Sequence, residues 1–264
     1  MRAITADKEA LAAALEKDSN SSLVSLLKEL QMTVVERSAT NLRLLYKELT
    51  DVELLTEILN SALLSADPDT ALNRLERCMG TADPDEFRMV LGQQSRRDQL
   101  LTVMGGSPFL AGLFCRQGGC FSKLLIQERI DHPCDEESML AELRQRIPLD
   151  ASFAELKRQL RLFKNEQVLR IGSRDLCGLA TLEEVTAELS ALAAAALQRS
   201  IEVCTVQLQD EYGEPLEETE SGLRPAEFCV LGMGKFGGRE LNFSSDIDLI
   251  YCYSSPQGRT SGGT

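Results

Sequence analysis

The sequence predicts a mainly helical protein that leads, near its C-terminal end, into the beginning of an α+β unit. Leucine and alanine dominate the composition, and both residues favour helix. Apolar residues recur at helical spacing through about the first 209 residues. Two short apolar runs with strand character follow only after residue 226. We therefore expect a helical domain at 1–209, an acidic linker at 210–225 and the start of a second domain at 226–264.

The first predicted helices follow a ragged helical start over residues 1–20. Leucines then recur at helical spacing over 23–48, which predicts an amphipathic helix. Thr50 and Glu53 have the spacing of a capping box and predict the start of the next helix.

Proline and glycine mark the next boundaries. Asp67-Pro68 and Asp83-Pro84 each place an N-cap residue before a proline at the first helical position, so each pair predicts a new helix. A glycine pair at 105–106 predicts a helix end. Residues 107–127 are expected to form two short apolar helices broken at 118–119.

Three further helices are expected before the linker. The first covers 138–147 and ends at a proline, and the second opens at the capping box of Ser152 and Glu155. A brief break is expected at 170–176. Thr181 and Glu184 form another capping box, which opens a long helix to about residue 209.

The charge balance limits the classes of partner. The chain has 41 acidic and 28 basic residues and a net charge of −13. Neutralising phosphates requires clustered Lys and Arg, so we expect a protein or small-molecule partner and no nucleic acid. The N-terminus lacks the apolar core of a signal peptide, and no apolar run approaches membrane-spanning length. We expect a cytoplasmic protein without a membrane partner.

The eight cysteines are scattered and include no CxxC pair, so we expect them to be reduced. Cys115, Cys120, His132 and Cys134 form the tightest group and could supply four zinc ligands, but their spacing matches no common zinc module. His132 is the only histidine, which leaves little room for a Ser-His or Cys-His nucleophile elsewhere.

Residues 228–253 carry the pattern most closely tied to chemistry. The apolar run 228–231 is consistent with a buried strand, and a glycine-rich turn follows at 232–238. Asp246 and Asp248 then alternate with apolar residues, which on a strand would put both carboxylates on one face and Ile247 and Leu249 on the core side. Paired carboxylates repel each other unless a cation lies between them, and Mg²⁺ prefers such oxygen ligands.

Three interpretations of this stretch compete. Gly232, Gly234 and Gly237 fit the dinucleotide pattern GxGxxG, but Asn and Ser residues interrupt any long helix and the acids come too early. The glycines could instead form a plain turn and the aspartates a solvated strand face. A glycine turn followed by a metal-binding Asp-x-Asp is what nucleotidyl transfer requires, because it positions phosphate and neutralises developing charge. The order of the parts favours this third interpretation.

The stretch from Val230 to Ile250 has the sequence VLGMGKFGGRELNFSSDIDLI and resembles the bifunctional glutamine synthetase adenylyltransferase/adenylyl-removing enzymes. The likeness is to their N-terminal, adenylyl-removing half, and residues 160–193 and 105–114 resemble that half as well. The seven-residue gap between Gly238 and Asp246 is also like this family. The resemblance implies a polymerase-β-like nucleotidyltransferase core, only partly present here.

The resemblance also implies roles for individual residues. Asp246 and Asp248 would bind Mg²⁺ or Mn²⁺, and Gly237 and Gly238 would face the phosphate groups. The other residues implied near phosphate are Ser244, Ser245 and Lys235, for which a turn-capping or solvent-exposed role is an equal alternative. Three residues of the family-like segment, Arg170, Arg174 and Asp175, are expected to hold the helical region to the catalytic unit.

The reactions implied are removal of AMP from a tyrosine of glutamine synthetase by phosphate, giving ADP, and in the full enzyme also addition of AMP from ATP. The implied partners are glutamine synthetase, the PII signalling protein, the nucleotide and phosphate. The family places a third carboxylate beyond residue 255, whereas no Asp or Glu follows Asp248 here. We therefore expect an N-terminal fragment with little activity of its own.

Two other functions remain open. The helical part could be an inert docking module for glutamine synthetase or PII. The chain could also be a transferase of the same superfamily that acts on a small molecule or nucleic acid, but its acidity and its family-like motif argue against this.

Overall fold

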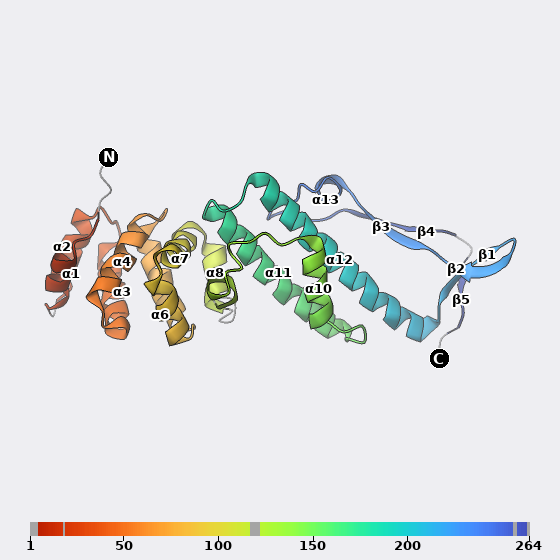
Figure 1. Ribbon diagram of the computed structural model, residues 1–264, viewed down its shortest axis with the longest axis horizontal. Helices are drawn as coiled ribbons and strands as arrows, with labels where there is room; N and C mark the ends of the chain where they lie inside the picture. The colour runs from red at the N-terminus through yellow and green to blue at the C-terminus, as the bar shows by residue number, and fades with distance from the viewer. Residues whose placement is uncertain (1–4, 18, 117–121, 256–257, 263–264) are drawn as a thin grey trace. The chain divides into compact units, whose positions relative to one another are not determined.

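The computed structural model describes residues 5–17, 19–116, 122–255 and 258–262. It confirms a mainly helical chain that leads into small sheets (Figure 1). The chain divides into two compact units, residues 1–132 with 172–179 and residues 133–171 with 180–264. Helix α11 (Phe153–Leu176) therefore contributes to both units.

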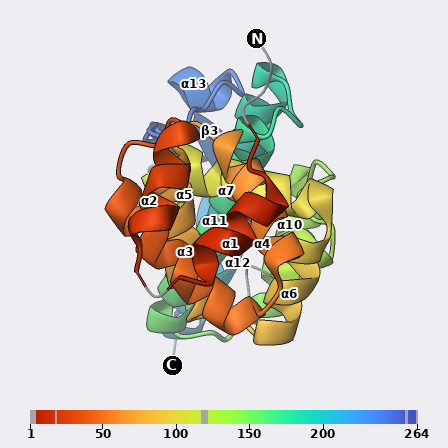
Figure 2. The same ribbon diagram turned by 90° about the vertical axis from the view of Figure 1, so that its left-hand side faces the viewer.

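The first unit is built from short helices that pack around a leucine-rich core (Figures 1 and 2). Helix α5 packs against α3 and α7, and α4 packs against α7. Fully buried side chains include Leu42, Leu55, Ile58 and Leu59. The helical elements of this unit are α1 (Lys8–Leu15), α2 (Ser21–Glu29), α3 (Val35–Leu49), α4 (Val52–Leu63), α5 (Pro68–Met79), α6 (Pro84–Gly92), α7 (Gln94–Gly106), α8 (Pro108–Arg116) and the π-helical η1 (Ser122–Ile126).

Aspartate caps set several of the helix starts. Asp67 and Asp83 cap α5 and α6 as predicted, each followed by a proline in the first turn. The capping box predicted for Thr50 and Glu53 is wrong, because the Asp51 side chain accepts the Leu54 amide and caps α4. Thr50 instead ends α3 in the left-handed region at φ 54°.

The helix predicted over 23–48 is two helices. Helix α2 ends before Gln31, which has a φ of 62°, and α3 begins at Val35. The buried carboxylate of Asp69 fixes the connection, since it accepts hydrogen bonds from the Thr33 amide at 2.8 Å and the Ser38 hydroxyl at 2.6 Å. Asp69 lies on α5, so the periodicity of residues 23–48 could not reveal this contact.

The helical part of the second unit comprises α10 (Glu136–Arg146), α12 (Leu182–Tyr212) and most of α11. Buried Met139, Leu143 and Phe163 belong to the core that these helices share. The Thr181–Glu184 capping box is present as predicted. Ser152 gives the Glu155 amide a side-chain acceptor at 3.3 Å, so this half of the second predicted box also forms.

The break predicted at 170–176 is wrong, because α11 runs through it to Leu176. Gly172 lies within the helix where a Cβ atom would come within 2.8 Å of the Leu110 side chain. Close packing against Leu110 therefore accounts for a glycine inside this helix.

In the described part of the second unit, five short strands form two sheets. In the first sheet, β1 pairs antiparallel with both β2 and β5; in the second, β3 pairs antiparallel with β4, with Val230 opposite Tyr251. The bounds are β1 (Pro215–Thr219), β2 (Gly222–Pro225), β3 (Phe228–Gly232), β4 (Leu249–Tyr253) and β5 (Gly258–Thr260), with the short helix α13 (Gly234–Gly237) after β3. The segment 210–225, expected to be a linker, instead holds the end of α12 and the β1–β2 hairpin.

Helix α12 is the one helix in the described residues that is long and apolar enough to meet the length and composition of a membrane span. Core helices pass the same test, and α12 carries buried Leu192, Ala195 and Val203 in a shared core. Its buried charges are Glu188 and Arg199.

Candidate functional site

The glycine-rich turn is compact because α13 folds back onto the end of β3. The Gly237 amide donates to the Met233 carbonyl at 3.1 Å, and the Gly238 amide donates to the Gly234 carbonyl at 3.0 Å. A Cβ atom on Gly237 would lie 2.4 Å from the Gly232 carbonyl oxygen, so only glycine fits there. The two predicted phosphate-facing amides are thus already donors within the turn, although both residues are exposed.

The two aspartates lie in an extended segment just before β4, not on the strand as predicted. Both are exposed, and neither forms an ion pair within the described part of the chain. Backbone pairing holds Asp248 in place, because its carbonyl accepts the Met233 amide at 2.9 Å. The Asp248 carboxylate faces Gly234, where a Cβ atom would be 3.9 Å from its Oδ2. The structure therefore brings Asp248 to the start of α13.

The remaining predicted phosphate-binding residues divide into two kinds. Ser245 is engaged locally, since its hydroxyl donates to the Asn242 side-chain oxygen at 2.6 Å and its amide donates to the Asn242 carbonyl at 3.2 Å. Ser244 and Lys235 are exposed beside the turn. A capping role thus describes Ser245 in this structure, while Ser244 and Lys235 present their polar groups to solvent.

A contact with α12, not apparent in the sequence, anchors the turn. The Leu241 side chain is 4% exposed and packs with Ile171, Val185 and Leu189. Its amide donates to the Ser190 hydroxyl at 3.2 Å, and Phe236 packs against the same cluster. A lone leucine between the glycine turn and the serines was the only available signal. Ser190 gave none, because serine within a helix is ordinarily a surface residue.

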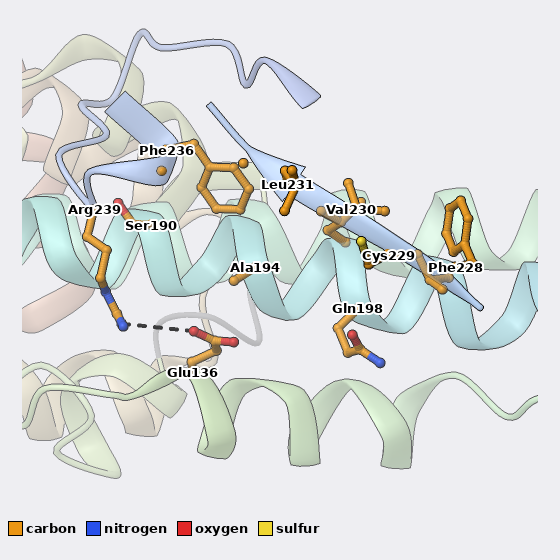
Figure 3. Close-up of a pocket in the computed structure, with 14 residues that line it drawn as sticks. Glu136, Ser190, Ala194, Gln198, Phe228, Cys229, Val230, Leu231, Phe236 and Arg239 are labelled. Atoms are coloured by element: carbon orange, nitrogen blue, oxygen red, sulfur yellow. Dashed lines mark ion pairs between the residues drawn. The ribbon is translucent and has the colours of Figure 1, made fainter. Parts of the chain in front are cut away.

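An open groove of about 650 Å³ separates α12 from β3 and α13 (Figure 3). The side chains of Leu231 and Phe236 line it on the strand side, and Ala194 and Gln198 line it on the helix side. Arg239, which adopts a left-handed φ of 59°, points toward Glu136 at 3.9 Å. Both side chains are largely exposed, so this ion pair is weak.

Of the three predicted anchoring residues, Arg170 binds a neighbouring helix and Arg174 binds backbone carbonyls outside the helices. Arg170 forms a buried ion pair with Glu188 of α12, and its Nε donates to Gln167 at 2.9 Å. Arg174 donates to the Ile130 carbonyl at 3.0 Å, and Asp175 is exposed. Arg170 therefore joins α11 to the helix on which the turn rests, which is a structural role.

The possible zinc group is not assembled by the described residues, among which no three His, Cys, Asp or Glu side chains cluster to hold a metal. Cys120 lies outside the described residues. The turn instead offers two solvent-accessible carboxylates, two residues apart, and no Lys or Arg of the described ranges pairs with either. Carboxylate oxygens of this kind are the donors that Mg²⁺ and Mn²⁺ prefer, and two of them would fill only part of a coordination sphere.

Comparison with known proteins places this region in a family. Residues 97–264 match the family model described as glutamate-ammonia ligase adenylyltransferase. The match includes the turn, both aspartates and α10–α12.

Similar proteins with curated names belong to the same family. The chain is 36% identical over 165 residues to the bifunctional glutamine synthetase adenylyltransferase/adenylyl-removing enzyme of Thioalkalivibrio sulfidiphilus, covering 62% of this chain and 17% of that protein. It is 35% identical over 176 residues to the enzyme of the same name from Pseudomonas aeruginosa, covering 67% and 18%. It is 47% identical over 108 residues to the enzyme of the same name from Burkholderia mallei, a match that covers 41% of this chain and 11% of that protein. The chain thus spans less than a fifth of these relatives.

Proposed function

Because this chain belongs to the glutamate-ammonia ligase adenylyltransferase family, we propose that it contributes to the reaction that removes AMP from a tyrosine of glutamine synthetase. Phosphate attacks the AMP phosphorus, the bond to the tyrosine oxygen breaks, and ADP leaves. In a protein as long as the relatives, we assign the addition of AMP from ATP to regions outside the stretch that this chain covers. We assign control by the PII protein to those regions as well. The proposed setting is the cytoplasm.

The observation that carries the proposal is a pair of exposed carboxylates beside a compact glycine turn, neither of which forms an ion pair with another described residue. The Asp248 backbone carbonyl accepts the Met233 amide, and the Asp248 carboxylate lies beside Gly234 at the start of α13. Asp246 lies two residues earlier in an extended segment and is exposed. We assign Asp246 and Asp248 as ligands of a divalent cation, Mg²⁺ or Mn²⁺. When bound, such a cation neutralises charge on transferring phosphate groups.

The neighbouring residues have supporting roles in this proposal. Lys235 and Ser244 are exposed beside the turn and are available to bind phosphate oxygens. Gly237 and Gly238 allow a nucleotide to approach the turn closely, because neither carries a side chain. Ser245 shapes the approach to Asp246 through its bonds with Asn242.

Two carboxylates make an incomplete metal shell, since these sites usually include further oxygen ligands. We therefore expect the 264-residue polypeptide alone to release little ADP from adenylylated glutamine synthetase in the presence of phosphate and Mg²⁺. Robust ADP release by the isolated chain would contradict this part of the proposal.

The decisive experiment is Asp246→Asn in a protein of the relatives' full length. We expect loss of ADP release by at least about a hundredfold, in line with removal of one group that stabilises transition-state charge. Glu220→Gln, a change at an exposed acid of the β1–β2 turn, is the matched control and should keep full activity. Equal activity of Asp246→Asn and the control would overturn the assignment.

The alternative function is an inert helical docking module for glutamine synthetase or PII. It is favoured by the large share of the chain that forms helices without site residues. Co-sedimentation with glutamine synthetase separates the two proposals. If Asp246→Asn leaves both binding and ADP release unchanged, docking is the function of this chain.

A further inference from the structure

Two cysteine thiols lie close together in the helical first unit, and neither is among the residues assigned above. Cys78 lies on α5 and is almost fully buried, whereas Cys115 lies on α8 and is half-buried. Their side chains interact with each other, and helices α5 and α8 pack together. The Cys115 thiol also lies 4.0 Å from the Arg74 carbonyl oxygen, one helical turn before Cys78 on α5. Both sulfur atoms therefore sit at the same turn of α5.

Three arginines make the surroundings of Cys115 positive. The hydrogen bond from Cys78 and the charges of Arg77, Arg116 and Arg74 lower the pKa of Cys115 to about 7, against an opposing effect of burial. The pKa of Cys78 is raised by its hydrogen bond to Cys115 and by burial. The half-exposed Cys115 is thus the more acidic thiol of the two, and the buried Cys78 is the less acidic one.

This arrangement separates the pair from an ordinary buried thiol. Thiolate character and access to solvent together decide which cysteines react with oxidants. Cys177 provides the contrast within the same unit, because burial raises its pKa to about 12. Cys115 has both properties, and it has a second thiol in contact with it.

We propose that Cys78 and Cys115 form a reversible dithiol–disulfide pair in which Cys115 reacts with hydrogen peroxide and Cys78 resolves the product. The Cys115 thiolate attacks one peroxide oxygen, an S–O bond forms and the O–O bond breaks. The departing hydroxide takes up the proton that the Cys115 thiol released on ionisation and leaves as water. The Cys78 thiol then loses its proton, its sulfur attacks the sulfenic sulfur, and the S–O bond breaks to release a second water. Two thiols lose two electrons and one peroxide is reduced.

The oxidised pair would join α5 to α8 covalently. A thiol reductant reverses the step by exchange. The proposal is independent of the metal site, since it uses no residue of the glycine turn or the Asp-x-Asp segment.

Peptide mapping tests the linkage directly on the full chain. Trypsin places the cysteines in separate peptides, with Cys78 in 78–88, Cys115 in 98–116 and Cys120 in 117–123. After peroxide treatment and alkylation of remaining thiols, we expect 78–88 disulfide-linked to 98–116 and released by reductant. A link from either peptide to 117–123 instead, or no link at all, would overturn the proposal.

Rates and variants assign the two roles. Iodoacetamide labelling of the 98–116 peptide should have a midpoint near pH 7, below the roughly 8.5 of an ordinary thiol. Arg77→Gln, at an exposed position, should raise that midpoint. Cys78→Ser should leave a sulfenic acid on 98–116 that dimedone traps, whereas Cys177→Ser should leave the disulfide unchanged. A labelling midpoint at or above about pH 8.5 would contradict the reactive role of Cys115. If Cys78→Ser fails to fold, peptide mapping of the wild-type protein still decides whether the disulfide forms.

Discussion

The helices and the sheets of the second unit differ sharply in how their apolar residues are used. In α10–α12, Met139, Leu143 and Phe163 are fully buried in one shared core. In β3 and β4, Phe228 is 53% exposed and Tyr253 is 66% exposed, although the strands are just as apolar in sequence. The helices therefore bury their apolar side chains against one another. The strands that carry the candidate site bury few apolar side chains and depend on a small number of contacts with α12.

The contact that holds the candidate site against the helices is made mainly by Leu241. Leu241 is the only apolar residue in the described part of 213–262 that is fully buried, and it packs on α11 and α12. Burial of one leucine side chain is worth about 2 kcal/mol. The stacked rings of Phe228 and Tyr251, 6.2 Å apart, add a cross-strand contact on an open face. Site geometry thus rests on a much smaller apolar contact than the helical core does.

The largest expected effect comes from breaking the helical side of this comparison. Phe163→Ala removes a ring that is fully buried and lies 5.1 Å beneath the Arg146 guanidinium. We expect a loss of about 3–5 kcal/mol in the free energy of unfolding, from lost transfer energy and the cavity left behind. Tyr251→Ala in β4 is the matched aromatic control and should cost less than about 1 kcal/mol. Urea unfolding measures the loss of unfolding free energy in each variant. Equal losses in Phe163→Ala and Tyr251→Ala would show that the strands are packed as tightly as the helical core.

A smaller and local effect is expected at the joint between the two regions. Leu241→Ala should cost about 2–3 kcal/mol of local stability, because a buried side chain is lost. Amide hydrogen exchange within residues 228–253 should then become roughly thirtyfold faster or more, while the core amides of α10 and α12 stay protected. Leu223→Ala, at an exposed position of β2, is the control. Unchanged exchange in 228–253 would show that other contacts hold the turn.

The sequence predicted much of this organisation where local chemistry decides it. Asp67, Asp83 and the Thr181–Glu184 box marked helix starts correctly, because caps act within one turn. The glycine turn and the adjacent aspartates were identified as a unit, and the turn does lie between two strands. The family assignment followed from the same residues and is confirmed by the matching family model.

The errors arose where distant residues decide the outcome. A helix break was expected at 170–176, but α11 continues through it, and Gly172 packs closely against the Leu110 side chain. The apolar run of β3 indicated burial, and Ile247 was expected to face the core; the strand forms, yet Phe228, Leu231 and Ile247 remain exposed. The 210–225 segment looked like a linker because its acids hide a pairing pattern, in which Arg224 and Ser254 both bind the buried carboxylate of Glu217. None of these partners is adjacent in sequence.

The smallest expected effect concerns charge within the helical side. Hydrogen bonds from Arg144 and from Arg199 lower the pKa of Glu202 to about 2 from an ordinary 4.5, although burial opposes the shift. A carboxyl whose folded pKa is depressed stabilises the fold above its unfolded pKa, and this contribution is lost as pH falls from about 4.5 toward 2. Glu202→Gln should therefore flatten the fall in unfolding free energy across that window, by about 1 kcal/mol or less after solvent screening. Glu218→Gln, an exposed acid in β1, should leave the profile unchanged. Urea titrations at a series of pH values measure the difference, and an identical slope for Glu202→Gln and the wild type would show that these ion pairs do not stabilise the helical core.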